Sequence, residues 1–184
     1  MQKINFSCKE FQEIYAYIRA KIITNLARNQ IRKISHIKSP FFIIAIPGSL
    51  HIVDLCLHYI PPNQKVILIS NGLSKWENNW AENNLRLDGL ISISSMLEHG
   101  RVIDFLIRHY KKPFGILDYD CFVFNPSTFS EISNINSITM LNAVFIHRNE
   151  SLNLDIPETF MLYLNRDLIK KIQKKYHVRS HIQE

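Results

Sequence analysis

Four short apolar runs, separated by segments with helical patterns, constrain the fold more than any other feature of the sequence. The runs are FFIIAI, VILIS, GLISI and FGIL, at residues 41–46, 66–70, 89–93 and 114–117. An uninterrupted apolar run of this length is typical of a strand that is buried on both faces. Because strands that alternate with helices favour right-handed crossovers, we expect an α/β fold with a mainly parallel sheet and helices on both faces.

The segments between the runs carry helix start signals. Ser49 follows the first run and is placed to cap a helix. Ser74 with Glu77, and Ser95 with Glu98, both have the spacing of a capping box. Each of the first three runs is therefore followed by a predicted helix, as the alternating pattern requires.

An amphipathic helix is predicted ahead of the first run. Its apolar side chains recur at steps of three and four, at Phe11, Ile14, Ile18, Ile22 and Leu26. We interpret this stripe as a core contact or a lid rather than a membrane anchor, because the helix has little excess hydrophobicity.

Beyond residue 120 the alternation weakens. Residues 121–124, CFVF, are a candidate short strand, and later strands are predicted within 137–147 and 159–164. A final helix is expected from about Arg166, with lysines toward its C-terminal end, where they suit the helix dipole.

The length of 184 residues suits one well-cored domain. We divide it into a helical extension (1–39), a ligand-binding core (40–126) and a short C-terminal part (127–184). The formal net charge of +6 fits an anionic ligand such as a nucleotide, although charge alone constrains function loosely. No motif for nucleic-acid recognition accompanies this charge, so no nucleic-acid partner is expected.

Cysteine usage and hydropathy bear on the compartment. Cys8, Cys56 and Cys121 form no CxxC pair, which indicates reduced thiols in a cytosolic chain rather than a disulfide framework or a zinc site. No apolar run approaches the roughly 20 residues that span a bilayer. We therefore predict a cytoplasmic protein, with peripheral contact at a membrane surface as an open alternative.

Polar residues follow each of the four predicted strands at its carboxyl end. They are Pro47-Gly48, Asn71-Gly72, Ser94-Ser95 and Asp118-Tyr119-Asp120. Open α/β sheets bind ligands at this edge, so we expect the four groups to converge on one site.

The pair Asp118 and Asp120 carries the clearest chemical indication. A carboxylate next to a buried strand is costly unless it is paired or bound to a metal. Hard oxygen ligands suit Mg²⁺ or Mn²⁺, and such ions commonly bridge a carboxylate to the phosphates of a ligand. The alternative is an acidic turn that is simply solvated.

These segments resemble a known enzyme class. PFGILDYDCFVF, preceded by SSMLEHGRVIDFLIRHY, resembles the DxD region of nucleotide-sugar-dependent glycosyltransferases of the Rossmann-like GT-A fold. FFIIAIPGS and KVILISNGLSKWE are similar to the first two strands of that fold. The resemblance covers about residues 41–126 and implies that this core binds a nucleotide sugar.

The resemblance implies a set of ligand contacts. Asp118 and Asp120 would hold Mn²⁺ or Mg²⁺, with Asp120 the direct ligand, while Asp118 and the intervening Tyr119 would contact the sugar or ribose. The nucleotide base and ribose would be lined by Pro47, Gly48 and Asn71. The donor's phosphates or ribose would face His99 and Arg101, for which a structural histidine and a solvated arginine remain the alternatives.

The implied reaction is transfer of a sugar from a nucleoside-diphosphate sugar to an acceptor hydroxyl on a glycan, lipid or protein. Such an enzyme usually continues into an acceptor-binding half with a general base. The remaining acidic residues before the tail occupy no assignable motif; they are Glu150, Asp155, Glu158 and Asp167.

Two other functions stay open. One is a non-catalytic domain that binds a nucleotide sugar or a partner. The other is a phosphatase of the haloacid dehalogenase type, with Asp118 as nucleophile and Asp120 as acid/base.

Overall fold

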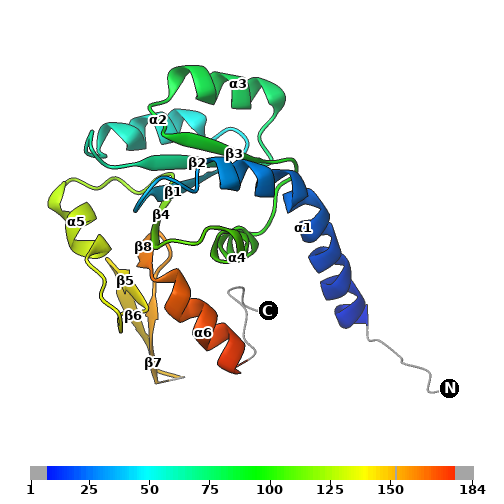
Figure 1. The fold of residues 1–184 in the computed structure, drawn as a ribbon, viewed down its shortest axis with the longest axis vertical. Helices are drawn as coiled ribbons and strands as arrows, with labels where there is room; N and C mark the ends of the chain where they lie inside the picture. Colours follow the sequence, from blue (N-terminus) through cyan, green and yellow to red (C-terminus); the bar gives the residue numbers. More distant parts are fainter. Residues whose placement is uncertain (1–7, 152, 177–184) are drawn as a thin grey trace.

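The computed structural model describes residues 8–151 and 153–176, which form an α/β arrangement around one six-stranded sheet (Figure 1). The strand order is β3-β2-β1-β4-β8-β5. Neighbouring strands among the first four are parallel: β1 (Phe41–Ala45), β2 (Val66–Asn71), β3 (Gly89–Ile93) and β4 (Phe114–Asp118). The four apolar runs therefore form strands as predicted, and the mainly parallel sheet is confirmed.

The remaining strands extend the sheet on the β4 side. β8 (Met161–Leu164) pairs antiparallel with β4, and β5 (Leu141–Ala143) pairs antiparallel with β8. A separate two-stranded hairpin is formed by β6 (Ile146–Asn149) and β7 (Leu154–Pro157). The sequence did not predict β7.

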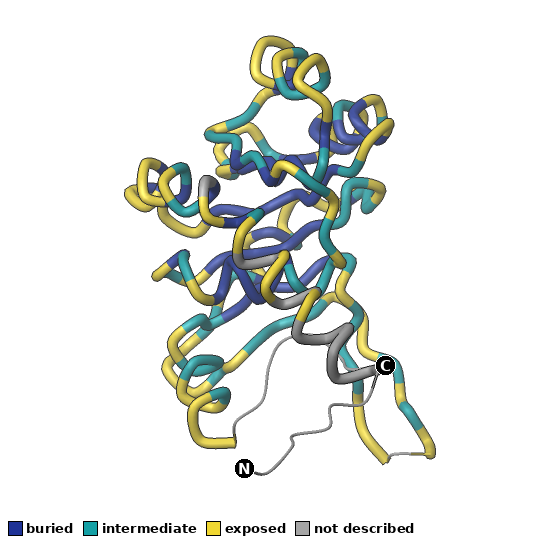
Figure 2. The backbone as a smooth tube through the Cα atoms, turned by 90° about the vertical axis from the view of Figure 1, so that its right-hand side faces the viewer, coloured by how far each residue is buried: buried dark blue, intermediate teal, exposed yellow. Residues whose placement is uncertain are grey.

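Helices cover both faces of the sheet, as expected. One face packs against α2 (Leu50–His58), α3 (Lys75–Asn84) and α5 (Ser127–Ser133). The other packs against α1 (Cys8–Lys33), α4 (His99–His109) and α6 (Arg166–Tyr176). Alternate residues of each strand supply the two cores; Phe41 and Ile43 face the first set of helices, whereas Phe42 and Ile44 face the second. The strands accordingly form the dark-blue centre of Figure 2.

The register of α1 differs from the predicted stripe. Ile18 and Ile22 are exposed, and the side chains of Phe11, Ile14 and Leu26 lie outside those that the structure describes. The helix buries instead the side chains Thr24, Ala27 and Ile31, with Ile34 buried just beyond its end. Among the described side chains of α1, the buried ones lie in its C-terminal part, and the two described members of the predicted stripe do not face the core.

Of the three predicted caps, one is confirmed, one is right in position but lacks the side-chain bond, and one is wrong. Ser74 and Glu77 form the predicted capping box. Ser49 precedes α2 but its hydroxyl hydrogen-bonds the backbone of Ile46 instead. The helix expected from Ser95 begins four residues later at His99, because the intervening backbone is held by a contact from β2 that is described below.

The segment after β4 was also predicted incorrectly. Residues 121–124 form no strand; they cross α2, where the rings of Phe122 and Phe124 both contact Tyr59. The predicted strand within 137–147 is two strands, β5 and the start of β6. The final helix begins at Arg166 as expected.

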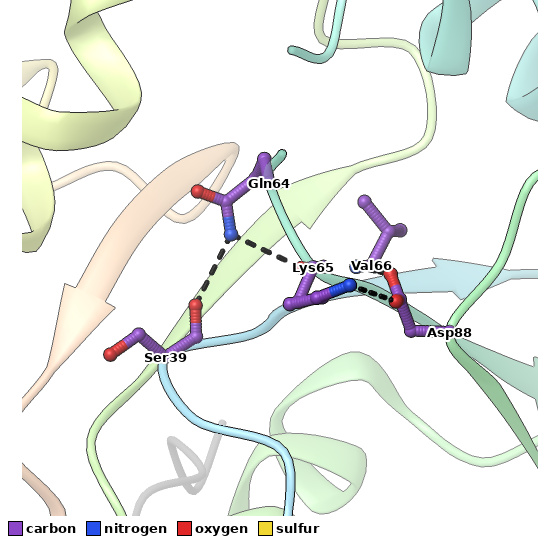
Figure 3. Close-up of polar contacts among 5 residues, drawn as sticks. All are labelled: Ser39, Gln64, Lys65, Val66 and Asp88. Atoms are coloured by element: carbon purple, nitrogen blue, oxygen red, sulfur yellow. Dashed lines mark hydrogen bonds and ion pairs between the residues drawn. The ribbon is translucent and has the colours of Figure 1, made fainter. Parts of the chain in front are cut away.

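The amino edge of the sheet is closed by polar contacts (Figure 3). The Gln64 side chain donates to the carbonyls of Ser39 and Lys65, while Lys65 forms an ion pair of 2.9 Å with Asp88. The other carboxylate oxygen of Asp88 accepts from the Val66 N–H. These bonds use the polar groups at this edge to fix the strands.

The hairpin lies past the opposite, carboxyl edge. Val144, which follows β5, donates its N–H to the carbonyl of Met161, the residue that pairs with Leu117 near the end of β4. The next residues run beyond that end into β6. In Figure 1, the hairpin, α6 and α1 all extend toward the bottom of the view. No helix among the described residues is long and apolar enough to cross a membrane.

Candidate functional site

Asp118, Tyr119 and Asp120 form a turn at the carboxyl end of β4. The Asp118 N–H donates to the carbonyl of Phe160, and the Asp118 carbonyl accepts from the N–H of Cys121. These bonds, of 2.8 and 3.0 Å, fix both sides of the turn. Tyr119 packs toward the α2 and α5 side, whereas Asp120 is exposed.

The surroundings of Asp118 disfavour its charged form, and a bound cation would stabilise that form. Burial raises the pKa of its carboxyl, and the neighbouring Asp120 charge raises it further, while His99 acts in the opposite direction. Burial disfavours the charged form, and a second carboxylate repels it. A divalent ion bound here would favour ionised Asp118 over the protonated form.

His99 is the first residue of α4 and faces Asp118. Its Nε2 atom lies 3.5 Å from Asp118 Oδ1. This nitrogen is buried and makes no hydrogen bond among the described residues. The structure thus brings together two residues, 19 positions apart in the sequence, that were predicted to share a site. A buried nitrogen without a hydrogen bond is rare and commonly marks a place where a ligand or water completes the bonding.

Arg101 lies on the same helical turn. Its side chain is only 13% exposed, and Nε donates to Glu98 at 2.8 Å. The guanidinium is therefore held near the start of α4 rather than solvated, which removes the simplest alternative to a binding role. Its contact with a ligand stays a prediction.

The loop after β1 is fastened to the start of α3. Gly48 has a φ of +83°, which favours glycine, and its N–H donates to one oxygen of Glu77. The other oxygen of Glu77 accepts from the Ser74 N–H in the capping box. These hydrogen bonds lower the pKa of the Glu77 carboxyl. Pro47 and Gly48 are thereby presented on the exposed edge.

The loops after β2 and β3 are joined by Asn71. Its buried amide donates to the carbonyl of Leu97 and accepts from the Leu97 N–H, both at 2.8 Å. The next residue, Gly72, has a φ of +82°, and a Cβ there would lie 2.6 Å from the backbone nitrogen of Met96. Asn71 thus positions the loop that leads to His99. A direct contact of Asn71 with a nucleotide remains a prediction.

The described residues contain no group of three or more His, Cys, Asp or Glu side chains that could hold a metal ion. The residues at the edge still suit one, since two carboxylates two positions apart supply hard oxygen ligands. An ion bound by so few protein groups would need ligand phosphates to complete its coordination.

Sequence reasoning assigned no role to several residues at this edge. Arg19 of α1 donates to Ser95 in the loop after β3, and Phe160 fixes Asp118 through its carbonyl. Cys56 and Cys121 are free thiols whose pKa values are raised by burial to about 12 and about 11, which makes them poor nucleophiles. Only the capping-box spacing of Glu77 gave any signal for the bonds that organise the loops.

The fold is shared with a solved structure of another protein. A solved mannosyltransferase from Pyrobaculum calidifontis, in complex with GDP-Man and Mn²⁺, shares the fold with a TM-score of 0.53. The alignment covers 86% of this chain and 56% of that chain, at 11% sequence identity. At this identity the likeness establishes the α/β fold alone, which is consistent with the GT-A and Rossmann-like class.

The family follows from the sequence comparison. Residues 22–169 match the StrH glycosyltransferase N-terminal domain, and the chain belongs to that family. A Streptomyces griseus relative, the dTDP-dihydrostreptose–streptidine-6-phosphate dihydrostreptosyltransferase, is 34% identical over 89 residues. That match covers 47% of this chain and 22% of the relative. The matched segment thus spans about a fifth of the length of this relative, and neither comparison supports the phosphatase alternative.

Proposed function

We propose that this chain binds a nucleoside-diphosphate sugar through a divalent metal at Asp118 and Asp120, and that it takes part in transfer of the sugar to an acceptor hydroxyl. The observation that carries the proposal is the pairing of His99 Nε2 with a partly buried Asp118 at the carboxyl end of β4. Membership in a glycosyltransferase family supports the same reading.

Each residue at the edge has a part in this proposal. Asp120, exposed on the turn, is the direct metal ligand, and Asp118 contacts the sugar or ribose and shares the ion. His99 and Arg101 face the phosphates from the start of α4. Tyr119 and the loops of Pro47-Gly48 and Asn71 border the nucleotide. When bound, Mn²⁺ or Mg²⁺ would neutralise the diphosphate and stabilise it as a leaving group.

The proposal does not specify which nucleotide is bound, because the two similar proteins differ in this respect. The Streptomyces relative is named for a dTDP-sugar, and the Pyrobaculum structure contains GDP-Man. We therefore include thymidine, guanosine and uridine diphosphates in the test.

Calorimetric titration tests the donor site. We expect dTDP, GDP or UDP to bind the wild type in the presence of Mn²⁺ and to bind at least tenfold more weakly, about 1.4 kcal/mol, to Asp120→Asn. The substitution keeps the size of the side chain and removes its charge. The matched control is Asp167→Asn, because Asp167 is an exposed carboxylate on α6 that pairs with Arg166.

A wild type that binds none of the three nucleotides with any metal would refute the proposal. If a nucleotide binds, release of the diphosphate from dTDP-glucose or GDP-mannose then separates an enzyme from a binding domain. Binding without any release, with or without an added acceptor, would favour the non-catalytic alternative.

A further inference from the structure

A second histidine–carboxylate pair lies next to the turn that carries Asp118. Nδ1 of His147, on β6, lies 2.5 Å from Oε1 of Glu158, which follows β7. Both side chains are partly exposed, at 42% and 37%. This contact joins the two strands of the hairpin near its base, where the hairpin leaves the carboxyl edge.

The backbone fixes where this pair lies. Glu158 lies two residues before Phe160, so the Cα atoms of Glu158 and Phe160 are at most about 7 Å apart. The carbonyl of Phe160 accepts the Asp118 N–H. The Glu158 N–H donates to the carbonyl of Phe145, which lies two residues before His147. The pair therefore borders the turn of β4 on the β8 side, away from the loops of β1 to β3.

The hydrogen bond orients the imidazole. A carboxylate accepts from Nδ1–H and so holds the ring in the tautomer whose Nε2 carries a free lone pair. No other hydrogen bond or ion pair of the His147 ring is found among the described residues. A partly exposed imidazole whose Nε2 carries a lone pair, next to a site for a sugar donor, is what removal of a hydroxyl proton requires.

The other acidic residues of this region are placed differently. Asp155 pairs with Arg148 within the hairpin. Asp167 pairs with Arg166, whose Nε donates to the carbonyl of Ile107 near the C-terminal end of α4 and thus at the opposite edge. Glu158 alone of these three bonds to a group that can accept a proton.

Resting on the proposed function, we propose that His147 is the base that deprotonates the acceptor hydroxyl and that Glu158 is its positioning residue. Nε2 takes the proton as the hydroxyl oxygen bonds to the anomeric carbon. The bond from that carbon to the diphosphate oxygen breaks, and its electron pair leaves with the nucleoside diphosphate. Direct displacement of this kind inverts the configuration at the anomeric carbon.

The first test uses water as the acceptor. The full chain is given dTDP-glucose or GDP-mannose with Mn²⁺, and release of the diphosphate is followed against pH. We expect His147→Gln to lower kcat about 10²-fold or more and to abolish the acid-side fall in rate, because Gln cannot take the proton. Glu158→Gln is expected to lower kcat about tenfold. The control Arg148→Gln alters the neighbouring ion pair of the hairpin and should keep the wild-type rate.

Affinity separates this inference from the proposed function. Both His147→Gln and Glu158→Gln should bind the nucleotide diphosphate with Mn²⁺ as the wild type does, whereas Asp120→Asn should not. Wild-type turnover in His147→Gln, with normal binding, would overturn the role of His147 and leave the donor site intact. If the wild type itself shows no metal-dependent binding of the nucleotide diphosphate, both the role of His147 and the proposed donor site would be overturned.

A second measurement decides the matter if hydrolysis is too slow to follow. Diethyl pyrocarbonate acylates accessible neutral imidazoles, and peptide mass spectrometry reports the reaction at each histidine. We expect the sugar nucleotide with Mn²⁺ to slow acylation of His147 at least fivefold more than the nucleotide diphosphate does. The exposed His36, before β1 at the amino edge, is the internal control. Equal acylation of His147 under both conditions would overturn the proposal.

Discussion

The two sides of the carboxyl edge are built differently. The strands β1 and β2 are buried at every residue, and the loops after them are held by hydrogen bonds from Glu77 and Asn71. On the other side, β5 is only partly buried and both strands of the hairpin contain exposed residues, which appear yellow in Figure 2. The hairpin also leaves Phe145, Ile146 and Leu154 more than half exposed.

This difference separates a rigid side of the edge, formed by the loops after β1 to β3, from a more deformable side, formed by the hairpin. Loops that are bonded to each other across β1, β2 and β3 cannot move independently, which suits a ligand whose phosphates need fixed partners. The hairpin contacts the sheet through its base and keeps apolar side chains in solvent. Substitutions should therefore be costly on the first side and inexpensive on the second.

The largest effect should come from Gly115→Ala in β4. A Cβ at this position would lie 2.3 Å from the ring of Phe41, which is fully buried against Phe129 and Tyr163. The added Cβ would force the buried ring or the backbone to shift, so we expect the free energy of unfolding to fall by about 3 kcal/mol. Urea denaturation measures this change.

The matched change on the hairpin is Leu154→Ala. This side chain is 56% exposed, so we expect a change within about 0.5 kcal/mol. A loss at Leu154 comparable to that at Gly115 would show that the hairpin is part of the cooperative core, and the contrast between the two sides would be wrong.

The next effect concerns Asn71→Ala. The substitution leaves the N–H and carbonyl of Leu97 without their partner, and we expect a loss of about 2 kcal/mol in the free energy of unfolding. Asn84→Ala is the control, because the amide of Asn84 donates to the Trp80 carbonyl on an exposed helix face. Unchanged stability combined with weakened nucleotide binding would instead support the predicted direct contact of Asn71 with the ligand.

The sequence predicted the first side of the molecule well because its strands are buried on both faces. Such strands appear as continuous apolar runs, and all four were located within about one residue. The hairpin and β5 are short and partly exposed, and therefore lack either the apolar run or a clean alternation. The stripe on α1 did not predict the core face because its two described members, Ile18 and Ile22, are exposed.

The candidate site was predictable in place but not in detail. The carboxyl ends of parallel strands must share one edge, which brought Asp118, Gly48 and Asn71 together from topology alone. The bonds of Glu77 to Gly48 and of Asn71 to Leu97 link positions more than 25 residues apart, and no local pattern encodes them. The pair of His147 and Glu158 depends on the hairpin, so missing β7 meant missing the pair.

The smallest effect is a pH dependence of the free energy of unfolding, which arises at His109 at the end of α4. Burial lowers the pKa of His109 to about 4, and the charges of Arg28, Arg108 and Arg32 contribute in the same direction. The unfolded chain therefore takes up this proton at a higher pH than the folded chain does. The contribution to stability is complete above pH 6.5 and is lost as the pH falls toward 4.

We expect this proton to lower the free energy of unfolding by about 1 kcal/mol between pH 6.5 and 5, after allowance for solvent screening. His109→Gln should remove that part of the slope in urea denaturation at successive pH values, whereas Arg148→Gln on the hairpin should keep it. An undiminished slope in His109→Gln would place the acid sensitivity elsewhere. Because burial is the largest cause of the shift and α1 supplies Arg28 and Arg32 beside His109, such a result would argue against the packing of this end of α1 and α4, on which the rigid side of the comparison depends.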